Sequence, residues 1–378
     1  MRFAYLSADL GVPVFGNKGA SVHVRELTRA LRALGHEVLI LTPRADGDRP
    51  PGFDVPVHEV APGPGGREQQ RRRYASVLRR RALPLLREFA PDAIYERYSL
   101  FGTAGARLGR DLGVPLLLEV NAPLADEHAR YRGLDDAECA RRVERLLMRR
   151  ANRVLAVSPA IEQWLRSIGA DRLTVLPNAV DPQRFRPLDE AKAAGRADRP
   201  LVGFVGTLKP WHDVATLVRA LALLDRERPR LLVVGDGPER ERLAAECARA
   251  RVDAIFTGAL PHERVPAQLA AVDVAVAPYG RDDGFYFSPL KLVEYLAAAR
   301  PVVAADVGQI AHCVRPGETG CLYTPGDVAG LAAAIRGLLE DRARAAELGA
   351  AGRAHVRAEH TWAANARIVV DTVEAARG

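Results

Sequence analysis

The stretch 284–308 holds the residues whose types and spacing could do chemistry. Its loop ends at Ser288-Pro289, so the first N–H groups and the positive dipole end of the expected helix can hold an anion. Lys291 adds a cation in the first turn, and Glu294 follows at the spacing that places both on one helix face. A cation beside free amides suits a diphosphate, and a carboxylate one turn away suits the paired hydroxyls of a sugar. The stretch therefore predicts a nucleotide-sugar site.

The placement of lysine favours the same chemistry. The chain holds 54 lysine and arginine residues, but only Lys18, Lys192, Lys209 and Lys291 are lysines. Three of these four stand in glycine- or proline-marked loops or at an expected helix start. Chance is the alternative to a shared role in binding phosphate.

Two further loops could present groups to a phosphate. Backbone amides around Gly19 precede a helix and could face one, although the G-x-G-x-x-G spacing is absent and an ordinary flexible loop explains this segment equally well. After the strand expected at 201–205, Lys209 and His212 stand where a phosphate could be reached. A capping or solvated role is slightly favoured for His212.

Polar residues follow two apolar strands of the first half. Glu96 and Arg97 stand at the exit of the strand expected at 93–95. Glu119 and Asn121 are two positions apart, hence on one face of a strand end. Carboxylates there could orient sugar hydroxyls or accept a proton. A structural ion pair with Arg97 is an equally good interpretation.

Strand-like runs alternate with helical patterns throughout, which predicts stacked βαβ units and parallel sheets. A length of 378 residues favours two domains, and the polar, alanine-rich stretch 188–199 is the expected boundary. Ligands of such sheets bind at the carboxyl ends of strands. The strands are expected at 3–7, 37–42, 93–95, 116–120, 153–157 and 173–176, and then at 201–205, 230–234, 254–257, 274–277 and 302–304.

Composition narrows the class of protein. No apolar run approaches the ~20 residues of a membrane helix, and the N-terminus becomes polar too soon for a signal peptide. The four cysteines show neither metal spacing nor a disulfide framework, so we expect a cytoplasmic protein. The net charge of +7 permits an anionic partner, but no nucleic-acid motif is present.

A basic helix is expected over 67–87. Its alanines and leucines recur at helical spacing, opposite a row of arginines. A solvated face over a core stripe is the favoured interpretation. Weak peripheral contact with anionic lipid is the alternative.

Together these motifs resemble a retaining family 4 glycosyltransferase. That family has the GT-B fold, an α/β architecture of two Rossmann-like domains whose parallel sheets face a central cleft. The resemblance covers nearly the whole chain, and its markers are weak singly but strong in this order. They are Lys18-Gly19-Ala20, Ala156-Val-Ser158, Leu176-Pro-Asn178, Phe185-Arg-Pro, Val205-Gly206-Thr-Leu, Val234-Gly-Asp-Gly-Pro238, Phe256-Thr-Gly258, Asp273 to Pro278, and Glu294 through Pro301-Val-Val.

The resemblance implies an acceptor-binding domain at 1–187, a donor-binding domain at 188–360, and a last helix, 361–378, that packs back on the first domain. It also implies that neither a metal nor another cofactor is needed, because helix dipoles and cations carry the charge of the leaving group. The residues expected to bind the donor are Gly19, Thr207, Lys209, His212, Leu260, Tyr286, Ser288, Pro289, Leu290, Lys291 and Glu294. Those expected to bind the acceptor are Glu96, Arg97, Asn121 and His128, and the expected catalytic residues are Glu119, Asn121, Lys209 and Lys291.

The expected function is transfer of a sugar, with retention, from a nucleotide sugar to a hydroxyl of a small-molecule or lipid-linked acceptor. We expect UDP rather than GDP as the carrier. Tyr286, Thr207 and Asn121 depart from the family pattern, where a glutamate, an arginine and a histidine are usual. A non-catalytic GT-B protein that binds nucleotide sugars and supports a partner enzyme is therefore the alternative. A third is the same fold with epimerisation or phosphorolysis as its reaction.

Overall fold

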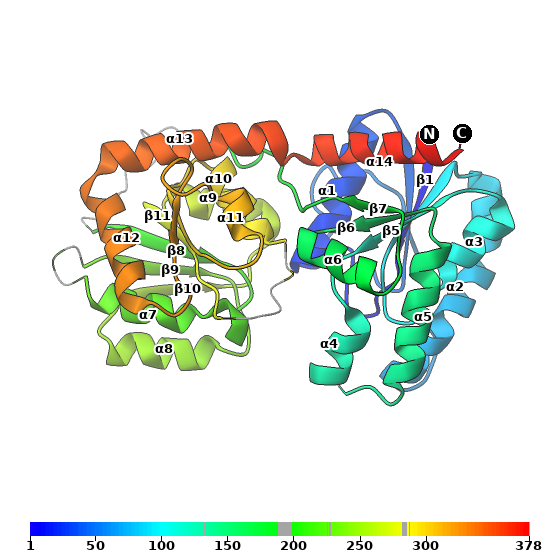
Figure 1. Cartoon of the computed structure of the whole chain (residues 1–378), viewed down its shortest axis with the longest axis horizontal. Coiled ribbons are helices and arrows are strands. Elements are labelled where there is room, and N and C mark those ends of the chain that lie inside the picture. Colours follow the sequence, from blue (N-terminus) through cyan, green and yellow to red (C-terminus); the bar gives the residue numbers. More distant parts are fainter. Residues whose placement is uncertain are drawn as a thin grey trace. The chain divides into compact units, whose positions relative to one another are not determined.

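The computed structural model describes residues 1–131, 133–187, 199–224, 226, 228–281, 286 and 288–377 (Figure 1). The chain divides into two compact units. Unit 1 comprises Met1–Asn178, Tyr286–Ser288 and Trp362–Gly378, and unit 2 comprises Ala179–Phe285 and Pro289–Thr361. The predicted boundary stretch falls outside the described residues except for Arg199. The assignment of one ligand to each predicted domain stays a prediction.

Unit 1 is built on a seven-stranded sheet in which every neighbouring pair is parallel. Its strands are short apolar runs, and Leu116–Val120 is buried at every position, as expected for a parallel strand covered on both faces. The sheet order is β3-β2-β1-β4-β5-β6-β7. The strands are β1 (Arg2–Ser7), β2 (Glu37–Thr42), β3 (Val57–Glu59), β4 (Ala93–Arg97), β5 (Leu116–Val120), β6 (Arg153–Ala156) and β7 (Leu173–Val175).

The helices of unit 1 follow local sequence signals. Ser158 caps α6, where its hydroxyl accepts the Ile161 N–H at 3.1 Å, and Pro159 occupies the first turn. The last helix, α14, packs against α1 within this unit (Figure 1). The helices are α1 (Gly19–Ala33), α2 (Arg67–Phe89), α3 (Ala104–Leu112), α4 (Leu124–Tyr131), α5 (Ala137–Arg150), α6 (Pro159–Ser167) and α14 (Trp362–Arg377).

Unit 2 repeats the arrangement with a six-stranded parallel sheet of order β10-β9-β8-β11-β12-β13. Its strands are β8 (Leu201–Val205), β9 (Arg230–Val234), β10 (Ala254–Gly258), β11 (Val274–Ala277), β12 (Val302–Ala305) and β13 (Cys321–Tyr323). Its helices are α7 (Val214–Ala222), α8 (Arg240–Arg249), α9 (Val265–Ala270), α10 (Leu290–Ala297), α11 (Ile310–Cys313), α12 (Val328–Glu340) and α13 (Arg342–Glu359), with 3-10 turns η2 (Pro210–His212) and η3 (His262–Arg264).

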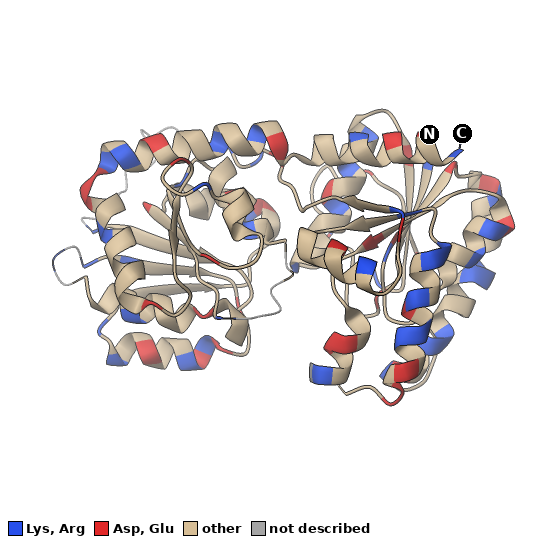
Figure 2. Ribbon diagram, viewed as in Figure 1, with Lys and Arg blue, Asp and Glu red and all other residues tan. Residues whose placement is uncertain are grey.

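The predicted α/β class with two parallel sheets is confirmed. Every expected strand is present, whereas β3 and β13, at the edges of the two sheets, were not expected. Arginines are spread along α2 and α5 in Figure 2, and α2 buries Tyr74, Leu78 and Leu86 beneath its basic side. None of the helices in the described part of the chain is long and apolar enough to span a bilayer.

The packing of α14 generates a first prediction. Val369 is fully buried on this helix, while its neighbour Ile368 is 38% exposed. Val369→Ala should lower the free energy of unfolding by about 2 kcal/mol, because methyl groups are lost and a cavity remains. Urea unfolding followed by tryptophan fluorescence measures this. Ile368→Ala is the matched control and should change stability by less than about 0.5 kcal/mol. Equal effects of the two changes would contradict the assigned packing.

Candidate active site

Lys291, in the first turn of α10, is a buried ammonium group that makes no hydrogen bond among the described residues. Nζ lies 4.2 Å from the ring centre of Phe204 and 5.2 Å from that of Tyr279. Burial lowers the pKa of Lys291 to about 7, although Glu294 opposes the shift. Buried polar groups in native proteins nearly always have partners. This lysine is therefore poised for an anion that restores its charge.

Glycine makes the approach to Lys291 possible. Gly206 follows β8 with φ of +146°, and a Cβ atom there would lie 2.8 Å from Lys291 Nζ. Gly235 follows β9 with φ of +141°, and a Cβ atom there would lie 2.0 Å from the Gly206 oxygen. Both positions require glycine for conformation and for space. The carboxyl ends of β8 and β9 are thus packed closely beside the ammonium group.

His212 joins this cluster from η2. Its Nδ1 donates a hydrogen bond to the Thr207 carbonyl at 2.5 Å. Its ring centre lies 5.7 Å from Phe204 and 5.4 Å from Tyr279. Burial, and then the positive charge of Lys291, hold the pKa of His212 far below its ordinary value. His212 is therefore a neutral member of an aromatic cluster and not a solvated histidine.

Lys209 and Thr207 lie on the same segment. Lys209 is half-buried, with Nζ 5.8 Å from the Trp211 ring centre, and Thr207 is exposed. The charge of Lys209 contributes to the lowered pKa of His212, so its ammonium group is near that ring. Two cations therefore lie near the carboxyl end of β8: Lys209, which follows this strand, and Lys291 from α10.

Glu294 is held by a histidine that the sequence analysis did not single out. Its Oε1 lies 2.7 Å from Nε2 of His262, in η3, and both side chains are buried. The ring of Phe185 lies 5.4 Å from that of His262 and limits its movement. Leu260, expected to bind the donor, is half-buried just before η3. The available signal for His262 was its position after β10, at the carboxyl edge of the sheet.

The predicted donor residues around the start of α10 belong to different units: Pro289 and Leu290 lie in unit 2, and Tyr286 and Ser288 lie in unit 1. Pro289 is the N-cap, and no described side chain caps the helix. The first N–H groups, from Leu290 on, can therefore donate hydrogen bonds to an anion. Ser288 belongs to unit 1, where its hydroxyl accepts the Asn178 N–H at 2.9 Å and its carbonyl accepts the Asn178 amide at 2.6 Å. Tyr286 also belongs to unit 1, and its hydroxyl donates to Glu127 at 3.1 Å. Gly19 starts α1 in unit 1 and is exposed, and that helix too lacks a side-chain cap.

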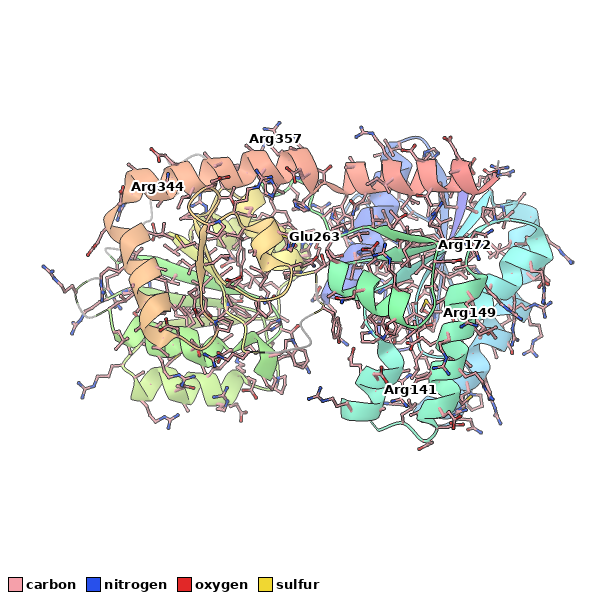
Figure 3. All side chains as sticks on the ribbon, viewed as in Figure 1. Arg141, Arg149, Arg172, Glu263, Arg344 and Arg357 are labelled. Carbon is pink, nitrogen blue, oxygen red and sulfur yellow. The ribbon has the colours of Figure 1, made fainter. Side chains whose placement is uncertain are left out.

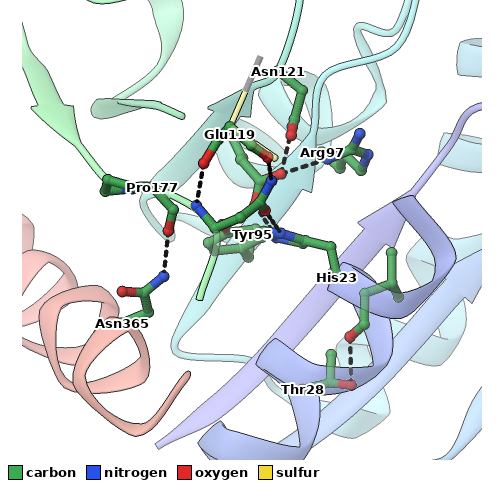
Figure 4. A network of polar contacts seen from close by, with 11 residues as sticks. His23, Thr28, Tyr95, Arg97, Glu119, Asn121, Pro177 and Asn365 are labelled. Atoms are coloured by element: carbon green, nitrogen blue, oxygen red, sulfur yellow. Dashed lines mark hydrogen bonds and ion pairs between the residues drawn. The ribbon is translucent and has the colours of Figure 1, made fainter. Parts of the chain in front are cut away.

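A polar network around Glu119 lies at the carboxyl edge of the sheet in unit 1 (Figure 4). Glu119 Oε1 accepts from Arg97 at 2.7 Å and from Asn121 at 2.5 Å. Oε2 accepts the Tyr95 hydroxyl and lies 2.5 Å from His23 Nε2. Burial opposes ionisation, but His23, Arg97 and Asn121 together hold the pKa of Glu119 well below its usual range. The predicted ion pair with Arg97 is present.

His23 links this network to the end of unit 1. Its Nδ1 lies 2.8 Å from Asn178 Oδ1, and the Asn178 amide nitrogen donates to Ser288, which fixes the oxygen as the atom facing His23. The two ring nitrogens of His23 therefore face Glu119 on one side and Asn178 on the other. The ring of Trp362, the first residue of α14, meets it edge-on at 4.9 Å. The sequence offered no signal for His23, because its partners are distant along the chain.

Glu96 and His128 are separate from the Glu119 network. Glu96 is fully buried on the other face of β4, and its Oε2 accepts the Gly105 N–H of α3 at 3.1 Å. Burial raises the pKa of Glu96 to about 8. His128 is buried on α4 and lines a small hollow in unit 1. The other polar side chains of that hollow are Asp9, Arg71, Tyr74 and Ser99.

Comparison with known proteins places the chain among sugar-transferring enzymes. Residues 17–184 match the family described as Glycosyltransferase Family 4, and residues 199–341 match Glycosyl transferases group 1. A D-inositol 3-phosphate glycosyltransferase of Nocardia farcinica is 32% identical, over 99% of this chain and 89% of its own. A GDP-mannose-dependent alpha-mannosyltransferase of Mycobacterium tuberculosis is 31% identical, over 82% of this chain and 81% of its own. The solved sucrose-phosphate synthase from Thermosynechococcus elongatus superposes with a TM-score of 0.78 at 25% identity, over 98% of both chains. These similarities confirm the expected GT-B fold.

The burial of Glu96 generates a prediction about pH. Between its unfolded pKa near 4.5 and its folded pKa near 8, the folded protein keeps a proton that the unfolded chain has lost. This group therefore makes stability fall as pH rises through that window. Glu96→Gln cannot titrate, so its stability relative to the parent protein should rise by roughly 3 kcal/mol from pH 5 to pH 8.

Urea unfolding of parent and variant at the two pH values measures this difference. Glu88→Gln changes an exposed carboxylate of the same unit and is the matched control, for which no such divergence is expected. Parallel stabilities of Glu96→Gln and the parent would mean that Glu96 is already ionised in the fold.

Proposed function

Because the chain belongs to glycosyltransferase family 4, we propose that it transfers a sugar, with retention of configuration, from a UDP-sugar to a hydroxyl of its acceptor. The observation that carries the proposal is the buried ammonium group of Lys291 at the start of α10, which makes no hydrogen bond to any residue that the structure describes. A diphosphate supplies the missing negative charge at that point. We place the reaction in the cytoplasm, which the four free cysteines support.

The donor site that we propose lies in unit 2. Lys291, Lys209 and the first N–H groups of α10 bind the diphosphate. Glu294 binds the ribose hydroxyls, and His262 keeps its carboxylate in place. Thr207, His212, Leu260 and Pro289 complete the surroundings. For Gly19, Tyr286 and Ser288, which lie in unit 1, contact with the donor stays a prediction.

The proposed reaction needs no cofactor. The bond between the anomeric carbon and the diphosphate oxygen breaks, and the acceptor oxygen forms its bond on the same face of the sugar. The acceptor proton passes to the departing phosphate oxygen. Lys291 and Lys209 stabilise the negative charge that develops there, and Lys291 does so from a buried position. Preformed electrostatic stabilisation of this kind is the main catalytic contribution that we assign to the protein.

The acceptor side that we propose lies in unit 1. Arg97 and Asn121 are presented by Glu119, whose oxygens are engaged by His23, Tyr95 and these two residues. We therefore infer that Glu119 orients its neighbours and does not itself accept a proton. The inositol phosphate in the name of one relative supports a hydroxylated small molecule as the acceptor. For His128, contact with the acceptor stays a prediction. A lipid-linked acceptor, reached through the arginines of α2, is the alternative.

The donor nucleotide provides the first test. We expect one of UDP, GDP and TDP, titrated calorimetrically without added metal, to bind far more tightly than the others, with UDP first. GDP is the rival because one relative is GDP-mannose-dependent. Glu294→Gln should weaken the preferred nucleotide by about tenfold or more, the effect of one charged hydrogen bond. Glu318→Gln, an exposed carboxylate of unit 2, should not.

The result also separates this proposal from a non-catalytic role. Slow hydrolysis of the matching nucleotide sugar would support an enzyme. Nucleotide binding without hydrolysis or transfer to any acceptor would favour a protein that only binds nucleotide sugars. If no nucleotide binds, even with magnesium present, the donor-site assignment fails.

Lys291 gives a prediction with a pH signature. Its pKa near 7 means that protonation must accompany diphosphate binding at higher pH. The affinity of the protein for the nucleotide should therefore fall above pH 7, by up to about tenfold per pH unit. Lys291→Met should remove this slope and lower kcat by about a hundredfold, or ~3 kcal/mol.

Calorimetry from pH 6 to pH 9 measures the nucleotide affinity of the parent protein and of Lys291→Met. Protonation of the nucleotide itself affects both proteins equally and cancels in the comparison. Lys209→Met, in which the half-buried cation is removed, should keep the slope while binding more weakly. An unchanged slope in Lys291→Met would show that another group takes up the proton.

A further inference from the structure

Three side chains that the proposed reaction does not use gather at the end of α13. His355, Glu359 and His360 each offer one ligand atom, and these three atoms lie within 4.8 Å of one another. His355 and Glu359 are one turn apart on a single helix face, and His360 follows directly where α13 ends. Two imidazoles and one carboxylate are a ligand set that zinc favours.

His355 supplies an independent indication of a ligand. It is only 7% exposed, and neither of its ring nitrogens makes a hydrogen bond among the described residues. Nδ1 lies 3.3 Å from Glu359 Oε1, and the ring meets that of His360 edge-on with centres 5.3 Å apart. A buried imidazole normally has a partner for at least one nitrogen. This one is directed toward two further metal-binding groups.

Neighbouring contacts hold the other two side chains close to His355. Arg315 donates to Glu359 Oε1 at 3.0 Å, which orients the carboxylate, as outer hydrogen bonds commonly do at metal sites. The backbone of His360 is held by Val356 and by Val180, whose N–H donates to the His360 carbonyl at 3.0 Å. Arg357, on the same helix, is exposed (Figure 3).

We propose that His355, Glu359 and His360 bind a divalent transition metal ion, zinc above all, with a water molecule in the remaining position. The site is structural, because none of its residues belongs to the proposed donor or acceptor sets. It adjoins the bridge between Val180 and Thr361, two residues of unit 2 that lie next to its borders in the sequence. The bound ion would fasten the end of α13 beside this bridge.

The test uses full-length protein without a histidine tag, stripped of metal with a chelator and dialysed. Zinc is titrated in competition with a chromophoric chelator, and cobalt is added separately to record its visible spectrum. The parent protein should bind one equivalent and give the absorption of four-coordinate cobalt with nitrogen and oxygen ligands. His355→Ala and Glu359→Gln should each weaken zinc binding by more than about tenfold, since even outer-shell changes commonly have that effect.

His312→Ala removes an exposed histidine of α11 in the same unit and is the matched control, expected to bind zinc like the parent. Circular dichroism shows whether His355→Ala folds, and Glu359→Gln serves where it does not, because Glu359 is largely exposed. Equal zinc affinity in the parent and in Glu359→Gln would overturn the proposal. So would the absence of stoichiometric binding by the parent, or a thiolate–cobalt band, which would assign the metal to the free cysteines.

Discussion

The buried carboxylate of Glu119 is the constraint on which unit 1 depends. An isolated carboxylate could not remain ionised at 1% exposure, so the fold must bring donors to both oxygens. Those donors come from β4, from the residue after β5 and from α1. Satisfying one charge therefore sets the positions of three segments. The same chain of contacts continues through His23 to Asn178, where unit 1 ends before the chain enters unit 2.

Lys291 in unit 2 is the opposite case. Its ammonium group is also buried, but aromatic rings and a glycine lie beside it, and it makes no hydrogen bond to any described residue. A protein that merely needed stability would fill this position with an apolar side chain. The contrast separates the two charges: Glu119 is paired within the fold, whereas the diphosphate site that we propose would give Lys291 its partner. Burial does not distinguish Glu119 from Lys291, whereas their hydrogen-bond partners do.

Much of this arrangement could be predicted from the sequence, for physical reasons. Buried parallel strands are largely apolar, and residues at or just after their carboxyl ends share one edge of the sheet. The contact of Arg97 and Asn121 with Glu119 could therefore be predicted. The side-chain partners of His23, His262 and Tyr286 could not be predicted, because these partners are distant in the chain. Neighbouring residues can also diverge: Glu96 points to the opposite face from Arg97, because side chains alternate along a strand.

The depressed pKa of Lys291 has a consequence for how a bound diphosphate would be stabilised. Because burial lowers the pKa of Lys291 to about 7, binding of an anion at higher pH also draws in a proton. The folded protein has already removed water from the ammonium group, and Gly206 and the rings around it are fixed before the ligand arrives. Little solvent then has to reorganise as negative charge grows on the leaving group. The burial that weakens Lys291 as a free cation is thus what strengthens it against a developing phosphate charge.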